Sequence, residues 1–252
     1  MAKNKLNNQE EPGFIPGVYN YCDRWCEKCR LQLRCVSFVM GKKMEEKGGF
    51  DWEGGEVKYD EMWKRLKNVF EATFEILQEM ATERGMRVED IYASEQIDRE
   101  FLEEELGVVF GEDKPEDSDV LKTCRVYEHW AERCIEKVLE VPGHERVGED
   151  LEVVSWYLDL VQAKMQRVLR GGLLRRGTVE WRGNECDGLA KVALIAIELS
   201  ETSWKNIRKC FAECAVEIGH LLVMLEQLRT DIERLFPNAR EFQRPGFEKP
   251  VD

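Results

Sequence analysis

The sequence predicts an all-α protein: a bundle of five to seven helices with an N-terminal, cysteine-rich, metal-binding arm. Three observations lead to this fold class. Apolar residues recur three and four positions apart over long stretches, as they do on one face of a helix. They never show the sustained alternation with a period of two that marks strands. Four of the nine cysteines fall within residues 22–35.

Composition divides the 252 residues into five segments. Residues 1–18 are polar, contain two prolines and are expected to form an extended arm, whereas residues 19–40 form a cysteine segment expected to bind metal. Residues 41–57 contain five glycines among charged residues, which is typical of a linker. We expect residues 58–237 to form the helical bundle and residues 238–252 to form a polar tail.

The first helices of the predicted bundle have clear boundary signals. Apolar periodicity predicts a helix over residues 59–84, which Gly85 would end. A weaker helical period covers residues 91–106. Ser118, between two aspartates, offers an N-cap oxygen for a further helix, which would end at Pro142 and the glycine after it.

The later helices follow the same logic. One helix is predicted over residues 151–168, and Asp187 could cap another over residues 189–197. That helix is apolar on most sides, so we expect it at the centre of the domain. The longest periodic run covers residues 204–235 and ends before Pro237. At 1.5 Å per residue, it predicts a single rod of about 50 Å.

Charge and hydropathy exclude several classes of function. The chain has 37 basic and 50 acidic residues and a net charge of −13, so it repels nucleic-acid phosphates and anionic lipids. No apolar run is long enough to span a membrane, and the first ten residues lack the apolar core of a secretory signal. We therefore expect a cytoplasmic protein that binds neither nucleic acid nor membrane and acts with a protein partner.

Cys22, Cys26, Cys29 and Cys35 follow the spacing C-x3-C-x2-C-x5-C. In a reducing cytosol, clustered thiols indicate metal ligands rather than disulfides. On a regular helix the first three would share a face, but Cys35 would lie on the opposite side. Cys22 and Cys29 would also be about 10 Å apart along the axis. We therefore expect a loop around Cys22 and a helix that begins near Cys26.

The spacing is compatible with two kinds of metal centre. Compact runs of cysteine are typical of [4Fe–4S] clusters, whereas structural zinc sites usually combine two short hooks that lie far apart in sequence. We therefore predict a [4Fe–4S] cluster, with Zn²⁺ as the alternative. The first three cysteines also resemble the C-x3-C-x2-C motif of radical S-adenosylmethionine enzymes. That family implies a βα barrel and an open iron, but this chain lacks alternating strands, and Cys35 would fill the open position.

Three functions follow from these ligands. A cluster with four cysteine ligands has no iron free for a substrate, so we predict electron transfer, redox sensing or support of a partner enzyme. The first alternative is a protein-interaction module whose structural zinc site, made by the same four cysteines, pins the arm. The second is a ferritin-like di-metal carboxylate oxidase, because Glu217 and His220 form an E-x-x-H pair. A second such pair is absent from the sequence, so further carboxylates would have to complete that site.

Charged and aromatic residues near the cysteines and on the helices need an explanation as well. Basic residues such as Arg24 could offset the negative charge of a cluster, and Trp25 could pack the arm onto the bundle. Lys164, Arg167 and Lys191 lie on helices expected to face the core. A buried charge must be paired or line a cavity, so these residues indicate a buried ion pair or a pocket for an anion.

The remaining cysteines lie outside the arm: Cys124, Cys134, Cys186, Cys210 and Cys214. They could form a second thiolate site. Three of them fall on apolar helical stripes, where cysteine usually serves as a small buried hydrophobe, and we expect that role here.

Overall fold

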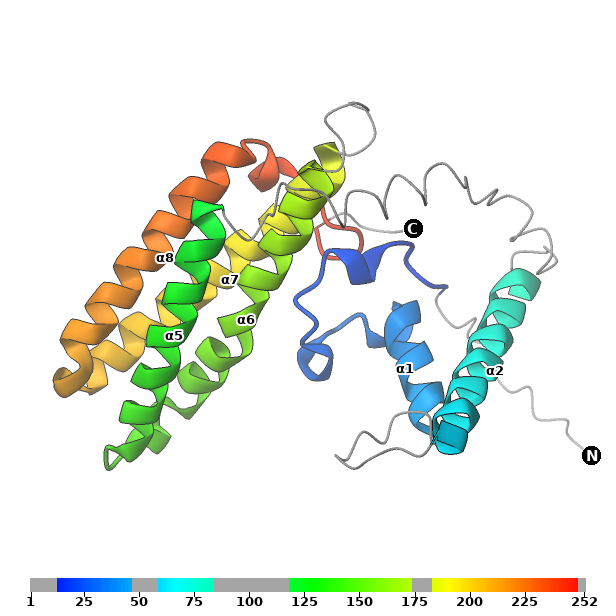
Figure 1. Ribbon diagram of the computed structural model, residues 1–252, viewed down its shortest axis with the longest axis horizontal. Helices are drawn as coiled ribbons and strands as arrows, with labels where there is room; N and C mark the ends of the chain where they lie inside the picture. The colour runs from blue at the N-terminus through cyan, green and yellow to red at the C-terminus, as the bar shows by residue number, and fades with distance from the viewer. Residues whose placement is uncertain (1–12, 47–58, 84–117, 174–182, 249–252) are drawn as a thin grey trace, which may run out of the picture. The chain divides into compact units, whose positions relative to one another are not determined.

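The structure is a computed structural model that describes residues 13–46, 59–83, 118–173 and 183–248. These residues are mostly helical and contain no strand, which confirms the all-α class. They form six α-helices, coloured along the chain in Figure 1: α1 (Val36–Glu46), α2 (Tyr59–Glu83), α5 (Asp119–Glu140), α6 (Gly148–Leu173), α7 (Gly183–Cys210) and α8 (Ala215–Leu235). Within these ranges, none of the helices combines the length and the apolar character needed to cross a membrane.

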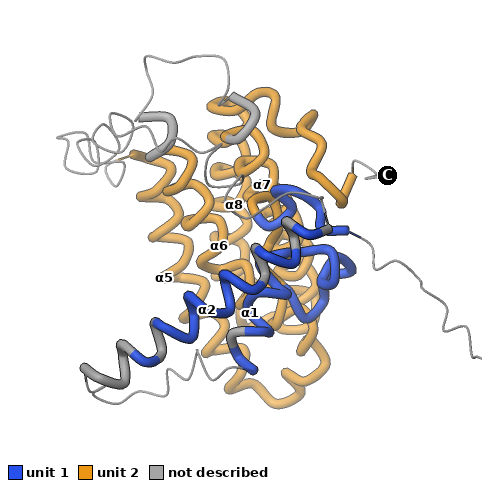
Figure 2. The backbone as a smooth tube through the Cα atoms, turned by 90° about the vertical axis from the view of Figure 1, so that its right-hand side faces the viewer, with its two compact units in different colours: residues 1–19, 26–103, 251 blue, residues 20–25, 104–250, 252 orange. Residues whose placement is uncertain are grey.

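The chain divides into two compact units (Figure 2). Unit 1 contains described residues 13–19, 26–46 and 59–83, and unit 2 contains residues 20–25, 118–173 and 183–248. This division separates the cysteines, because Cys22 belongs to unit 2 and the other three belong to unit 1. It also divides the predicted bundle over residues 58–237, because α2 belongs to unit 1.

Unit 2 is a four-helix bundle in which α5, α6, α7 and α8 lie side by side (Figure 1). The Ser118 hydroxyl accepts a hydrogen bond from the Leu121 N–H at 3.3 Å, which confirms the predicted N-cap of α5. The middle of α7 is almost completely buried, as expected for the central helix. The buried Trp204 Nε1–H donates to the Tyr127 hydroxyl at 3.1 Å, so these core polar groups are paired.

The predicted single rod over residues 204–235 is wrong. α7 ends at Cys210, Phe211 has extended backbone angles (φ −129°, ψ 91°), and a 3-10 turn, Ala212–Cys214, leads into α8. α8 then returns alongside α7 (Figure 1). Phe211 and Cys214 are themselves buried, so the apolar period continues across the turn and conceals it. α7 also begins at Gly183, which places Asp187 inside the helix rather than at its cap.

Unit 1 contains the shorter α1 and the long α2. α2 matches the helix predicted over residues 59–84. α1 continues through Gly41 to Glu46, so the first part of the predicted linker over residues 41–57 is helical. An ion pair between Lys43 and Glu79 joins the two helices. The helix predicted over residues 91–106 lies outside the described residues.

The segment after α8 folds back onto α7 as far as residue 248, although the sequence suggested only a polar tail there. Lys191 Nζ donates to the backbone carbonyls of Arg240 (3.2 Å) and Phe242 (2.5 Å). It also lies 3.7 Å from a Glu248 carboxylate oxygen. Lys191 therefore holds the C-terminal segment, rather than forming a pocket for an anion.

Candidate metal centre

The cysteine segment has irregular backbone. Its only regular features between Cys22 and Cys35 are two single 3-10 turns, Cys26–Lys28 and Gln32–Arg34. The expected loop around Cys22 is present, but the helix expected near Cys26 is only the single 3-10 turn that begins there, because α1 begins only after Cys35. The Gln32 side-chain amide donates to the Cys26 carbonyl at 2.5 Å and so occupies an acceptor that a continuing α-helix would use.

Cys26 and Cys29 form a closed hook within unit 1. The Cys29 N–H donates to the Cys26 carbonyl at 3.0 Å, which closes the C-x2-C turn. The N–H of Leu31 points at the Cys29 sulfur, 3.4 Å away. Hydrogen bonds to sulfur are one means by which proteins tune the thiolate ligands of metal clusters. A hydrogen bond from this N–H would stabilise negative charge on the Cys29 sulfur.

Cys22 lies on a segment that is docked on the bundle of unit 2. We call residues Asn20–Trp25 the docked segment. The Trp25 ring stacks on Trp156 at 5.0 Å and meets Tyr157 edge-on at 5.8 Å between ring centroids. Trp25 is buried, which confirms that it packs this part of the arm onto the bundle.

Polar contacts fix the same segment. The Tyr157 hydroxyl donates to the Asp23 carboxylate at 2.8 Å, and Trp156 Nε1–H donates to the Asp23 carbonyl at 3.1 Å. Burial and the nearby Asp23 carboxylate raise the pKa of Tyr157 above its ordinary value, so this hydroxyl keeps its proton. Arg24 has φ +59°, a left-handed conformation that is uncommon outside glycine and marks a forced turn between Cys22 and Cys26.

The C-terminal segment, residues 236–248, also contacts the docked segment. The Phe242 ring lies 4.7 Å from the Tyr21 ring, between centroids. Gly188 of α7 lies beneath both rings, and a side chain there would clash with the Tyr21 and Phe242 rings. The docked segment is therefore held between α6, α7 and the C-terminal segment.

The four cysteines belong to different units of the chain, Cys22 to unit 2 and the others to unit 1. Across the described parts of the chain, no three His, Cys, Asp or Glu side chains are grouped so that they could hold a metal ion. All four cysteines are half-buried. Unit 1 presents one formed hook, and unit 2 presents one anchored cysteine.

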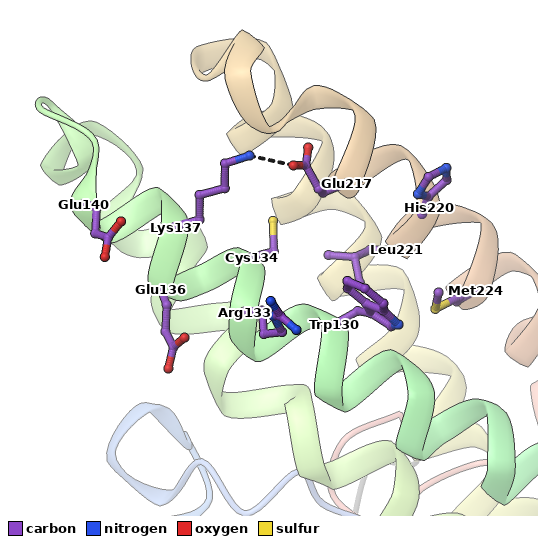
Figure 3. A pocket seen from close by; sticks show the side chains of 10 residues that line it. All are labelled: Trp130, Arg133, Cys134, Glu136, Lys137, Glu140, Glu217, His220, Leu221 and Met224. Carbon is purple, nitrogen blue, oxygen red and sulfur yellow. Dashed lines mark hydrogen bonds and ion pairs between the residues drawn. The ribbon is translucent and has the colours of Figure 1, made fainter.

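The E-x-x-H pair lies beside a groove of about 570 Å³ between α5 and α8 (Figure 3). The Glu217 carboxylate is ion-paired with Lys137 Nζ at 2.5 Å, and this pairing lowers the pKa of Glu217. His220 points away from Glu217, as do Glu136 and Glu140 on α5 (Figure 3). No further ligand faces the pair among the described residues, so the di-metal alternative gains no support.

The remaining cysteines match the expectation of buried small hydrophobes in three cases. Cys124, Cys134 and Cys214 are buried in unit 2. Burial raises the pKa of Cys124 and of Cys134 to about 12 each, so both stay protonated near neutral pH. Cys210 is exposed at the end of α7, and Cys186 is half-buried near its start.

Three residues that hold the docked segment were not identified from the sequence: Trp156, Tyr157 and Phe242. Their contacts join positions far apart in the chain and leave no local periodic pattern. The only available signal was weak: two adjacent aromatic residues in one helix, one of which must lie off its buried stripe.

Comparison of the chain with protein-family models, with curated proteins and with solved structures gives no match. The case for a metal centre therefore depends on the residues of this chain and their geometry.

Proposed function

We propose that Cys22, Cys26, Cys29 and Cys35 bind a [4Fe–4S] cluster, and that the protein uses it to exchange electrons with a protein partner. The observation that carries the proposal is four cysteines within residues 22–35, on backbone that contains no α-helix. Irregular backbone removes the axial separation that a helix would impose on Cys22 and Cys29. The thiolates can then approach one another from a loop, as in other compact cluster-binding runs.

In this proposal, metal binding brings the four cysteines together and orders the loop that carries them. Metal-binding free energy commonly arranges ligands that are apart in the metal-free chain. Here the backbone between the cysteines holds only two single 3-10 turns, so no α-helix has to unwind for the ligands to converge. The hook at Cys26 and Cys29 supplies two ligands, and the docked segment supplies Cys22 from a fixed position on the bundle.

The ligand count determines the kind of chemistry. Four thiolates complete the coordination of a cubane cluster, so such a centre carries electrons and leaves no iron for a substrate. Zinc would use the same ligands as a structural staple. The single compact group of cysteines favours the cluster, because closed zinc sites usually draw on two separated hooks.

The test is the iron, zinc and acid-labile sulfide content of the full chain purified without oxygen. We expect about four irons and four sulfides per chain, together with brown colour. Cys29→Ser should lose the iron, whereas Cys210→Ser, which changes an exposed cysteine outside the arm, should keep it. One zinc without sulfide would refute the cluster, and metal-free protein would refute the site altogether.

A further inference from the structure

The groove between α5 and α8 is bounded at one end. Its floor is formed by Cys134 and Leu221, which are almost completely buried. Lys137 Nζ is ion-paired with Glu217 on the opposite helix and also donates to the Glu213 carbonyl at 3.3 Å. This bridge spans the groove at the surface (Figure 3). A partner's helix laid along the groove would meet the bridge, whereas a compact ligand would not.

The indole ring of Trp130 lines the groove from α5. Trp130 is 48% exposed, and Leu221 and Met224 line the groove from α8 (Figure 3). The His129 ring meets the indole edge-on, 5.7 Å away between centroids. Aromatic rings gain energy by stacking on one another, and a methionine sulfur makes favourable contacts with them. The lining therefore suits an aromatic ligand.

Arg133 supplies a positive charge beside that ring. Its guanidinium carbon lies 5.5 Å from the centroid of the Trp130 ring. Among the described residues it forms no ion pair. The side chains of Glu136 and Glu140 point away, and the Glu217 carboxylate is already paired across the groove (Figure 3). The guanidinium is therefore free to receive an anionic group from a ligand.

The size of the groove fits a small molecule. Sites for such ligands commonly measure about 300–1,000 Å³ and combine an apolar lining with a few polar groups, and this groove measures about 570 Å³. We propose that the groove binds a small aromatic carboxylic acid. Its ring would pack against Trp130 and Met224, and its carboxylate would pair with Arg133, whose planar fork matches a carboxylate in geometry.

This site is independent of the proposed metal centre. It lies entirely within unit 2, between two helices of one bundle, and uses none of the four cysteines of the arm. It requires two features of the ligand together. A neutral amide of the same shape would keep the ring contacts and lose the ion pair with Arg133.

The test is isothermal titration calorimetry of the full chain with naphthoate and with its neutral isostere, naphthamide. Physiological salt screens the net negative charge of the chain. We expect naphthoate to bind about tenfold more tightly than naphthamide, because a hydrogen-bonded charge pair is lost in the amide. Arg133→Leu should remove that difference. Arg234→Leu should keep it, because Arg234 is an exposed arginine of α8 whose ion pair, with Asp231 at 2.9 Å, is local.

The ring contact is tested separately. Trp130→Ala should weaken the binding of both compounds about tenfold, whereas Phe70→Ala, which removes an exposed aromatic residue of α2, should not. Trp130 and Arg133 are both exposed, so circular dichroism of their variants should match that of the unaltered protein.

The outcomes separate this site from the metal centre. Equal affinity for the acid and the amide, unchanged binding by Trp130→Ala, or no measurable heat with either compound at millimolar concentration would refute the proposal. Cys29→Ser should bind naphthoate as tightly as the unaltered protein. Loss of iron in that variant with naphthoate binding retained would support both proposals, each on its own evidence.

Discussion

Replacing Trp25 by alanine should release the docked segment from the bundle. Trp25 is 8% exposed and stacks on Trp156 at 5.0 Å. Aromatic side chains bury about 150–250 Å², which at about 25 cal/mol per Å² corresponds to about 4–6 kcal/mol. Alanine keeps part of that area, and the unfolded chain already buries some of it. We therefore expect docking to weaken by about 3 kcal/mol, which is about a hundredfold in the docking equilibrium.

Tryptic cleavage after Arg24 reports this opening. The Arg24 side chain is exposed, but the peptide bond after it is held by the contacts of Asp23 and Trp25, so cleavage must follow local release of the segment. Under conditions in which closing is faster than cleavage, Trp25→Ala should raise the rate about a hundredfold. Trp25→Phe, which keeps an aromatic ring, should give a smaller rise.

Far-UV circular dichroism of the same samples provides the control for global unfolding. Helicity should remain, because the helices of the bundle keep their own buried core. An increase below about tenfold in the Trp25→Ala cleavage rate, equivalent to 1.4 kcal/mol, would show that the aromatic stack does not hold the segment.

Three further changes test other contacts. Phe242→Ala removes the second aromatic contact of the docked segment and should raise the rate of cleavage after Arg24 about fivefold, equivalent to about 1 kcal/mol. An unchanged rate would show that the contact between Phe242 and Tyr21 does not hold the segment. Burial raises the pKa of Tyr127 to about 12, so the folded state binds this proton more tightly and should lose stability in urea titrations as pH rises from about 10 to 12. Tyr127→Phe should remove that loss but cost about 1–3 kcal/mol at pH 7, because the Trp204 indole N–H is left unpaired. Glu217→Gln should leave the metal content unchanged, and loss of iron in this variant would revive the di-metal alternative.

Local signals were sufficient for most of the helices. α2 and α5 were predicted nearly to their ends, because periodicity and an N-cap act within a few residues. The break at Phe211 was missed, because the turn contains neither glycine nor proline, and Phe211 and Cys214 on either side of it are buried in the same core as both helices. A periodic pattern describes which residues are buried and does not record the direction of the chain.

The candidate site shows the same limit. Spacing alone selected the four cysteines, and helix geometry correctly required irregular backbone around Cys22. The hydrogen bond from Tyr157 to Asp23 and the stacking of Trp25 on Trp156 depend on how the segment docks on α6. Such contacts join residues that are distant in sequence, and only the folded chain brings them together.

The contacts that hold the docked segment have a consequence for how the protein is made. The segment contacts α6 and Phe242, which both lie far along the chain from Cys22. At about 5–20 residues per second, a ribosome needs roughly ten to forty seconds between Trp25 and Phe242. Throughout that interval the nascent cysteine has no completed surface to dock on. The docked segment therefore reaches its final place on the bundle only after the C-terminal segment has been synthesised.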